Sequence, residues 1–347
     1  MRLATGRYRV VLALLAVALV VSILVAVGVG AVGIAPTSAM RLIAWKLGLI
    51  ERPGDVSRAT EIILFELRLP RVALAAVVGL ALAVSGTLFQ GLFRNPLADP
   101  AIIGVSSGAA LGAVMVIVLG GGAIMGGLGI SLAAFVGGML TAFFVYRLAR
   151  VGPAVHVATL LLAGIAVAAV ISAAMSLLMS FAGEEIRSIY FWLLGGLSAR
   201  GWTALGIVAP LIGLGVAGVG VLIRDLNLVS LGEERAAQLG VDVDRFKWQA
   251  VALGALLTGA AVSVSGVIGF VGLMTPHVMR LVVGADHRRL LPAVLLAGPT
   301  FLVLADLVSR VALAPQELPL GAVTALIGGP FFLILLRRER RVAGATA

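Results

Sequence analysis

Residues 79–96 read GLALAVSGTLFQGLFRNP, and residues 259–276 read GAAVSVSGVIGFVGLMTP. Laid on each other, the two stretches share a Val-Ser-Gly at 84–86 and 264–266, an offset of 180 residues (264 − 84) in a chain of 347. Both are apolar and rich in Gly, Ala and Ser, residue types that recur wherever membrane helices pack closely. The match therefore indicates either an internal repeat of about half the chain or a coincidence between two small-residue helices.

Composition places the chain in a lipid bilayer. Hydrophobic residues make up 61% of the sequence and charged residues 12%, whereas a soluble domain is typically about half apolar and a quarter charged. Because lipid offers the backbone no hydrogen-bond partners, spanning segments must be helices or closed barrels, and long apolar runs without period-two alternation select helices. The sequence predicts an all-α integral membrane protein and excludes a soluble domain.

The sequence predicts about ten spans, with the count open by one because the eighth is short. About 20 residues cross the hydrocarbon core. The apolar stretches of this kind lie at 10–33, 69–90, 101–120, 127–148, 157–182, 202–223, 248–269, 271–285, 290–312 and 320–336. Five spans in each half, 1–182 and 183–347, is an odd number, so the halves must run in opposite directions, as in the inverted repeats of transporters. Together, residues 1–347 are expected to form one transmembrane domain.

The basic residues follow membrane topology and not a nucleic-acid surface. The formal net charge is +10, yet no basic patch is interleaved with aromatic residues, and the arginines lie between apolar runs. With the N-terminus in the cytoplasm, most of the 26 basic residues fall in cytoplasmic segments, as the positive-inside rule requires of short loops. We therefore expect membrane lipid around the chain, both termini in the cytoplasm and no nucleic-acid partner. The absence of cysteine excludes disulfides and thiolate metal sites.

The longest charged segment between spans, residues 224–247, contains the sequence LGEERAAQLG at 231–240. In a short amphipathic helix, the apolar side would carry Ala236, Ala237 and Leu239, and the polar side Glu233, Glu234 and Arg235. Such a helix suits docking into a groove on a cytoplasmic partner, although a solvated loop fits the sequence equally well. No G-x-x-x-x-G-K-[ST] loop is present to cradle a nucleotide, so the energy for any active transport must come from another chain.

Short motifs then follow one another in a fixed order from about residue 65 to the C-terminus. They are LRLPR (67–71), SG (85–86), Gln90, NPLA (95–98), GVSSG (104–108), LLLAG (160–164), FW (191–192) with Gly195, GE (232–233), QLG (238–240), GFVG (269–272), PH (276–277), DHR (286–288), AD (305–306) and ELP (317–319). With these motifs the chain resembles the FecCD family, the permeases of ferric-siderophore, haem and cobalamin importers. The resemblance covers over four-fifths of the chain.

The resemblance implies a permease that works in a bacterial cytoplasmic (inner) membrane as a homodimer, with the translocation path between the two copies. Two cytoplasmic ABC ATPase subunits would bind ATP and Mg, and an extracytoplasmic substrate-binding protein would deliver the cargo. The chain itself would be no enzyme and would bind no cofactor or metal. An iron(III)-siderophore-type chelate is the expected cargo, with haem or cobalamin as the alternative.

The family also assigns roles to particular positions of this sequence. The coupling helix that rests on the ATPase would comprise Gly232, Glu233, Glu234, Arg235, Ala236, Ala237, Gln238, Leu239 and Gly240. At the outer surface, Arg68, Arg71 and Arg310 match arginines that pair with acids on the binding protein; anchoring at the headgroups is the alternative. Asp306 and Arg310 are also four residues apart, which predicts a helical ion pair.

The translocation path is expected to follow the fifth span. Its small and apolar residues, Met175 and Met179 among them, would line the cavity, and Val157, Ala158 and Thr159 would form a cytoplasmic gate that is more apolar than is usual in the family. Arg187 would attract anionic cargo at the outer mouth or form a salt bridge to Glu184. His277 and His287 are interpreted as structural residues and not as ligands, because they are ten residues apart and no cysteine accompanies them.

Two other classes of function are weaker interpretations. An ion-coupled secondary transporter also uses inverted repeats, but it would need buried acids in its spans, and Asp306 is the central candidate. A membrane-embedded enzyme would need a catalytic constellation that three histidines in unrelated contexts do not supply.

Overall fold

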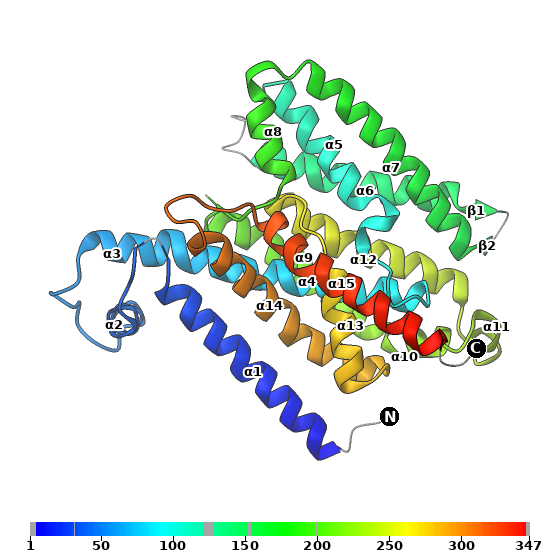
Figure 1. Cartoon of the computed structure of the whole chain (residues 1–347), viewed down its shortest axis with the longest axis horizontal. Helices are drawn as coiled ribbons and strands as arrows, with labels where there is room; N and C mark the ends of the chain where they lie inside the picture. Colours follow the sequence, from blue (N-terminus) through cyan, green and yellow to red (C-terminus); the bar gives the residue numbers. More distant parts are fainter. Residues whose placement is uncertain (1–4, 31, 121–127, 152–153, 199, 345–347) are drawn as a thin grey trace.

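The structure is a computed structural model that describes residues 5–30, 32–120, 128–151, 154–198 and 200–344. The helices that correspond to the ten predicted spans are α1 (Thr5–Gly28), α4 (Leu69–Leu92), α5 (Val105–Val118), α6 (Leu128–Leu148), α7 (Val157–Ser180), α9 (Trp202–Val221), α12 (Val243–Ser265), α13 (Val271–Val283), α14 (His287–Val311) and α15 (Leu320–Gly344). Of the described helices, seven are long and apolar enough to cross a bilayer, and α5, α13 and the apolar part of α15 are shorter. The predicted all-helical membrane fold is confirmed (Figure 1).

Short elements connect the long helices. They are α2 (Pro36–Lys46), α3 (Arg58–Ile62), the π-helix η1 (Ile63–Arg68), the 3-10 turns η2 (Pro100–Ile103) and η4 (Gly183–Glu185), α8 (Ile186–Leu193), α10 (Ile223–Val229), α11 (Glu233–Gln238) and the antiparallel pair β1 (Arg150–Val151) and β2 (Ala154–Val155). The helices α3, η1 and α4 are continuous, so residues 58–92 make one helical rod of 35 residues, longer than the predicted second span.

Several span boundaries differ from the predictions. The seventh span begins five residues earlier than expected, at Val243, and ends at Ser265, because Gly266 (φ +66°) and Phe270 (φ +68°) adopt left-handed backbone conformations that break the helix. The third begins at Val105 after a turn in which the Asp99 carboxylate accepts from the amide of Ala101. The two copies of Val-Ser-Gly are therefore not structurally equivalent: one lies inside α4, and the other ends α12.

The chain directions agree with the predicted inversion of the two halves. The Tyr8 hydroxyl, at the start of α1, donates to the carbonyl of Arg289 (3.2 Å), and Asn227 of α10, just beyond α9, donates to Asp286 (2.8 Å). Both acceptors lie at the start of α14, so α1 begins where α9 ends. By the same reasoning, α12 begins beside α11, whereas α4 begins at the opposite end through its Arg71 contact with Asp306 (2.9 Å). In Figure 1, the first turns of α1 and the last turns of α15 lie at the same end as α10 and α11.

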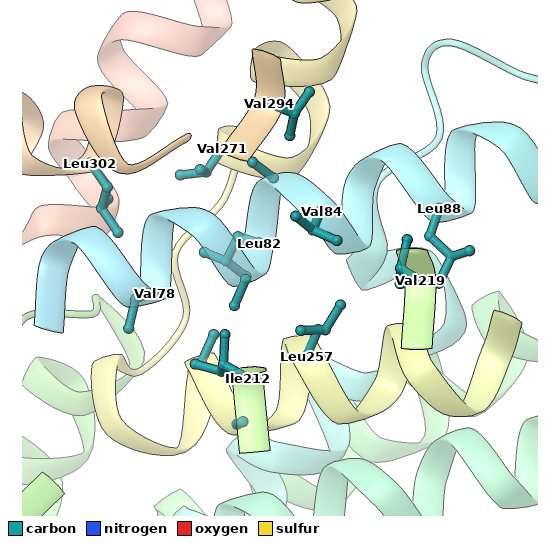
Figure 2. Packing of buried hydrophobic residues seen from close by; sticks show 14 of the residues in the cluster. Val78, Leu82, Val84, Leu88, Ile212, Val219, Leu257, Val271, Val294 and Leu302 are labelled. Carbon is teal, nitrogen blue, oxygen red and sulfur yellow. The ribbon is translucent and has the colours of Figure 1, made fainter. Parts of the chain in front are cut away.

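The helix α4 is the centre of the molecule. It packs against α9, α12, α13 and α14, while α5, α6 and α7 form a second group that contacts it through α12. Figure 2 shows apolar side chains of α4, such as Val78, Val84 and Leu88, meeting residues of the surrounding helices that include Ile212 and Leu257. Most side chains of α4 are buried, whereas α1, α7 and α9 leave one broad face uncovered.

Glycines let the backbones of the central helices touch. A Cβ on Gly86 of α4 would overlap the carbonyl oxygen of Gly272 in α13, and a Cβ on Gly79 would meet the carbonyl of Gly298 in α14. Beside this contact, the Ser85 hydroxyl lies 2.8 Å from that of Thr258 in α12. Without a hydrophobic driving force between helices in lipid, such close packing and polar bridging supply the attraction.

Substituting Gly86→Ala should therefore separate α4 from α13. We expect a loss of roughly 1–3 kcal/mol or more of stability, as for other overpacked cores, measured as a lowered thermal unfolding midpoint of the purified protein in detergent. The matched control is Gly213→Ala in α9, where an added Cβ meets nothing within 4 Å. This control should be neutral or slightly stabilising, because Ala is the better helix former. Equal midpoints for the two variants would contradict the backbone contact.

Candidate coupling and docking sites

The predicted cytoplasmic segment contains a helix, α11, which spans Glu233–Gln238. It follows Gly232, whose φ of +118° turns the chain sharply after α10. Ala236 is fully buried and holds the helix against the body of the protein, whereas Ala237 and Leu239, expected on the same apolar side, are exposed. The helix therefore leaves a mixed face uncovered, made of Glu234, Arg235, Ala237, Gln238 and Leu239.

A buried lysine joins α11 to two other elements. The Lys247 ammonium lies 2.6 Å from a carboxylate oxygen of Glu233 in α11 and donates to the carbonyl of Val155 in β2 (2.7 Å). Lys247 itself belongs to α12 and is 4% exposed. One cation thus ties α11, the start of α12 and the hairpin that leads into α7. Val157, Ala158 and Thr159, the predicted gate residues, begin α7 two residues beyond this contact.

A second polar network fixes α10 to the start of α14. The side-chain amide of Asn227 donates to Asp286, and its oxygen accepts from the backbone amide of His287 (2.9 Å) and lies 2.8 Å from Nδ1 of the same histidine. Beside this network, a hollow of about 520 Å³ opens between α10, the residue Leu239 and the turn before α14. The exposed side chain of Leu239 therefore lies at the rim of this hollow, next to α11.

At the opposite end, three charged side chains surround one buried acid. Asp306, 1% exposed, accepts from Nε of Arg71 (2.9 Å) and forms an ion pair with Nε of Arg310 (3.0 Å). The expected pair four residues apart is confirmed. Arg71 also bonds Glu317 (2.8 Å), which in turn accepts from the Ser198 hydroxyl. We call Arg71, Asp306, Arg310 and Glu317 the outer charge cluster.

Two of the predicted docking arginines cap a helix. The last carbonyls of α1 lack partners within the helix. The Arg68 guanidinium donates to the carbonyls of Val27 (2.9 Å) and Gly28 (3.1 Å), and that of Arg310 donates to the carbonyl of Ala26 (3.1 Å). Both side chains are more than nine-tenths buried. A role of Arg68 and Arg310 in docking stays a prediction. Because their guanidinium groups bond to α1, they would attract a partner through the net charge of this end of the molecule more than through direct hydrogen bonds.

Glu317 lies in the loop before α15 and its pKa is shifted. Burial alone would raise this pKa, but hydrogen bonds from Arg71 and Ser198, with the charges of Arg71 and Arg310, outweigh burial and hold it below the usual 4.5. The Glu317 carboxylate is therefore ionised at neutral pH within the cluster. It also borders a recess of about 370 Å³ that opens between α8, the end of α12 and the loop before α15.

The predicted path residues occupy two different settings. Met175 and Met179 of α7 are half-buried and pack against the cluster formed with α5 and α8. The uncovered face of α7 carries other apolar residues: Leu162, Ile165, Val170 and Leu177. Arg187 is exposed on α8, and its guanidinium lies over the Phe191 ring at 5.7 Å. None of the ion pairs among the described residues joins it to Glu184.

The two histidines belong to different surroundings. His287 bonds Asn227, and His277 packs edge-on against the Phe331 ring at 6.4 Å. Within the described ranges, no group of three or more His, Asp or Glu side chains is placed to hold a metal ion.

The sequence indicates several of the polar residues at these sites but not the residues that they contact. Lys247 is one of two lysines in the chain, and a lone lysine entering an apolar helix was the available signal. Arg280 of α13 donates to Gln90 of α4 (2.9 Å), a pair joined across 190 residues that no local pattern could connect.

Comparison with known proteins gives consistent similarities. Residues 17–338 match the FecCD transport family. The chain is 47% identical to the cobalamin import system permease protein BtuC of Halobacterium salinarum, over 82% of this chain and 76% of that protein. It is 46% identical to the hemin transport system permease protein HmuU of Yersinia pestis, over 79% of this chain and 83% of that protein.

A solved structure is similar as well. It is a metal-chelate type ABC transporter in an inward-facing conformation, with a TM-score of 0.80 at 33% identity, covering 94% of this chain and 98% of that chain.

A double-mutant cycle tests the Lys247 link. Lys247→Met and Glu233→Gln, singly and together, should show a coupling free energy within about 0.5–3 kcal/mol, because Glu233→Gln leaves the buried Lys247 ammonium without its carboxylate partner. The matched control is the exposed pair Arg41 and Asp55, which are 2.7 Å apart and whose coupling should be near zero. Thermal unfolding midpoints give both values, and additive effects at Lys247 and Glu233 would contradict the link.

The Glu317 carboxylate predicts a pH dependence of stability. Since its folded pKa lies below the usual 4.5, its ion pair stabilises the fold above that pH, and the contribution is lost as the pH falls through the folded pKa. Wild-type protein should therefore unfold at a higher temperature than Glu317→Gln at pH 7, and the two midpoints should converge below pH 4.5. A constant difference across this range would count against the ion pair.

Proposed function

The chain belongs to the FecCD transport family and is the permease of an ABC importer, and on that premise we propose how its parts are used. Two copies form the translocation path, two ABC ATPase subunits supply energy from ATP and Mg on the cytoplasmic side, and a binding protein delivers cargo to the outer side. The single observation that carries this proposal is α11, a short helix held at one end of the molecule with its mixed face uncovered.

The exposed face of α11 is the proposed docking site of the ATPase. It offers both charges and the apolar Leu239, which borders the 520 Å³ hollow beside α10. Helices that dock in a groove place an apolar anchor among polar groups in this way. Because Lys247 contacts both Glu233 and the Val155 carbonyl, movement of α11 would displace α12 and the hairpin that leads into α7. The proposed gate at the start of α7 would therefore respond to the conformation of the ATPase. ATP bound to the ATPase and cargo in the path would then both shift the same equilibrium, that between the open and the closed state of the gate.

The outer charge cluster, with Arg68, is the proposed place where the binding protein docks. Three arginines face two carboxylates there, a formal excess of one positive charge (3 − 2). Interfacial charge of this kind steers an acidic partner and sets its orientation more than it adds affinity. The opposite end, which carries α11, the start of α1 and the end of α15, would then be cytoplasmic, in agreement with the positive-inside rule.

The proposed cargo is a metal chelate of the tetrapyrrole or corrin type. Relatives with 47% and 46% identity are named for cobalamin and hemin transport, which favours these two over the siderophore expected from sequence. The path would run along the uncovered face of α7, where Leu162, Ile165 and Leu177 offer an apolar surface that releases its cargo easily.

A secondary transporter fits the structure less well. Such a carrier needs an acid that can take up and release an ion within the spans. Asp306 is the buried acid of α14, but it lies between two arginines and is held in ion pairs.

Uptake into proteoliposomes tests the proposal. The permease is reconstituted with its ATPase and binding protein, and cobalamin, haem and a ferric siderophore are offered with and without ATP. We expect ATP-dependent uptake of cobalamin or haem, and a strong loss in Leu239→Asp, an exposed change that leaves the fold intact. The matched control is Leu49→Asp, a leucine that is also exposed but lies at the other end of the molecule. ATP-independent uptake driven by an ion gradient would overturn the assignment.

A further inference from the structure

An apolar groove lies between the two halves of the protein, beside the central helices. Its walls are α6 from the first half and α9 from the second, and its floor is the end of α12, with Ser263 and Val264 buried there. The groove has a volume of about 600 Å³. From Leu128 to Phe135 it follows eight residues of α6, which span about 10 Å along the helix axis.

One charged residue borders this groove. Arg200 lies in the loop just before α9, and the rest of the lining is apolar or small and polar. None of the hydrogen bonds or ion pairs among the described residues uses its guanidinium, unlike those of Arg68, Arg71 and Arg310. The side chain is nonetheless half-buried, and burial lowers its pKa from the usual value. A partly desolvated cation without an internal anion favours binding of an external one.

A tryptophan next to Arg200 indicates where this cation lies relative to the bilayer. The indole of Trp202, the first residue of α9, donates to the carbonyl of Phe65 (2.8 Å), and its ring is 46% exposed. Tryptophan side chains of this kind gather at the headgroup level of membranes. Arg200, two residues before Trp202, is therefore expected at the height of the lipid phosphates, and the groove runs from it along α9 past Ala204 and Leu211.

We propose that this groove binds one anionic phospholipid, with the phosphate on Arg200 and an acyl chain between α6 and α9. The arrangement matches both parts of such a molecule: a fork of N–H donors suits a phosphate, and the apolar walls suit a hydrocarbon chain. The N-terminal amides of α9 add a positive electrostatic potential at the same place. Because the groove lies between the two halves, the lipid would stabilise one relative position of α6 and α9.

Lipid binding to the purified full-length protein tests the proposal. Native mass spectrometry in mild detergent would follow titration with short-chain phosphatidylglycerol, with diacylglycerol of the same chains and inorganic phosphate as parallel probes. Wild-type protein should bind one phosphatidylglycerol well above the level of diacylglycerol. Arg200→Gln should weaken binding about tenfold or more, since charge-assisted hydrogen bonds to phosphate are lost, and Arg200→Lys should restore part of it.

Two further variants separate the groove from general charge. Ala204→Trp fills the groove with the charge unchanged and should also lose the lipid. Arg58→Gln removes an exposed arginine from the same end of the molecule and should bind like wild type. Equal binding by Arg200→Gln and Arg58→Gln would overturn the proposal, as would displacement of the lipid by inorganic phosphate or by the transported chelate. The headgroup comparison on wild-type protein holds even if a variant folds poorly.

Discussion

The backbone of α4 touches the backbones of α13 and α14 with no side chain between them. Gly86 against Gly272 and Gly79 against Gly298 set these distances, and the bridge from Ser85 to Thr258 adds α12 to the same centre. In lipid, where apolar surfaces gain little from meeting one another, this contact of small residues holds the bundle together. The remaining helices pack around α4, whose position relative to α13 and α14 is set by these glycine contacts.

Both ends of the bundle use the same device, a buried cation that joins elements distant in the sequence. Lys247 joins α11, α12 and β2, and Arg71 joins α4, α14 and the loop before α15. A buried charge without a partner is destabilising. Moving any one of these elements away would leave the cation unpaired, which keeps the elements together. The proposed mechanism moves the elements that Lys247 joins as one unit.

Sequence alone predicts the helices well, because each span carries its signal within about 20 residues. It places the end of α12 wrongly because the apolar run continues through Gly266 into α13, and hydropathy does not record a left-handed residue. It finds α11 but not its attachment, since Glu233 and Lys247 come from different elements. Arg68 and Arg310 are expected at the surface, yet their acceptors are carbonyls of α1, which no local pattern can reveal.

The capping of α1 also bears on the order of assembly. Arg68 follows its acceptors by 40 or 41 residues, whereas Arg310 follows its own by 281 or 284. During synthesis the first arginine reaches the membrane soon after α1, while the second arrives only when α14 is inserted. Because open carbonyls are costly in lipid, Arg68 can hold the end of α1 through translation of the whole second half. The contact from Arg310 can form only after α14 is inserted, so we expect it to complete this end of the bundle late in the maturation of the nascent chain.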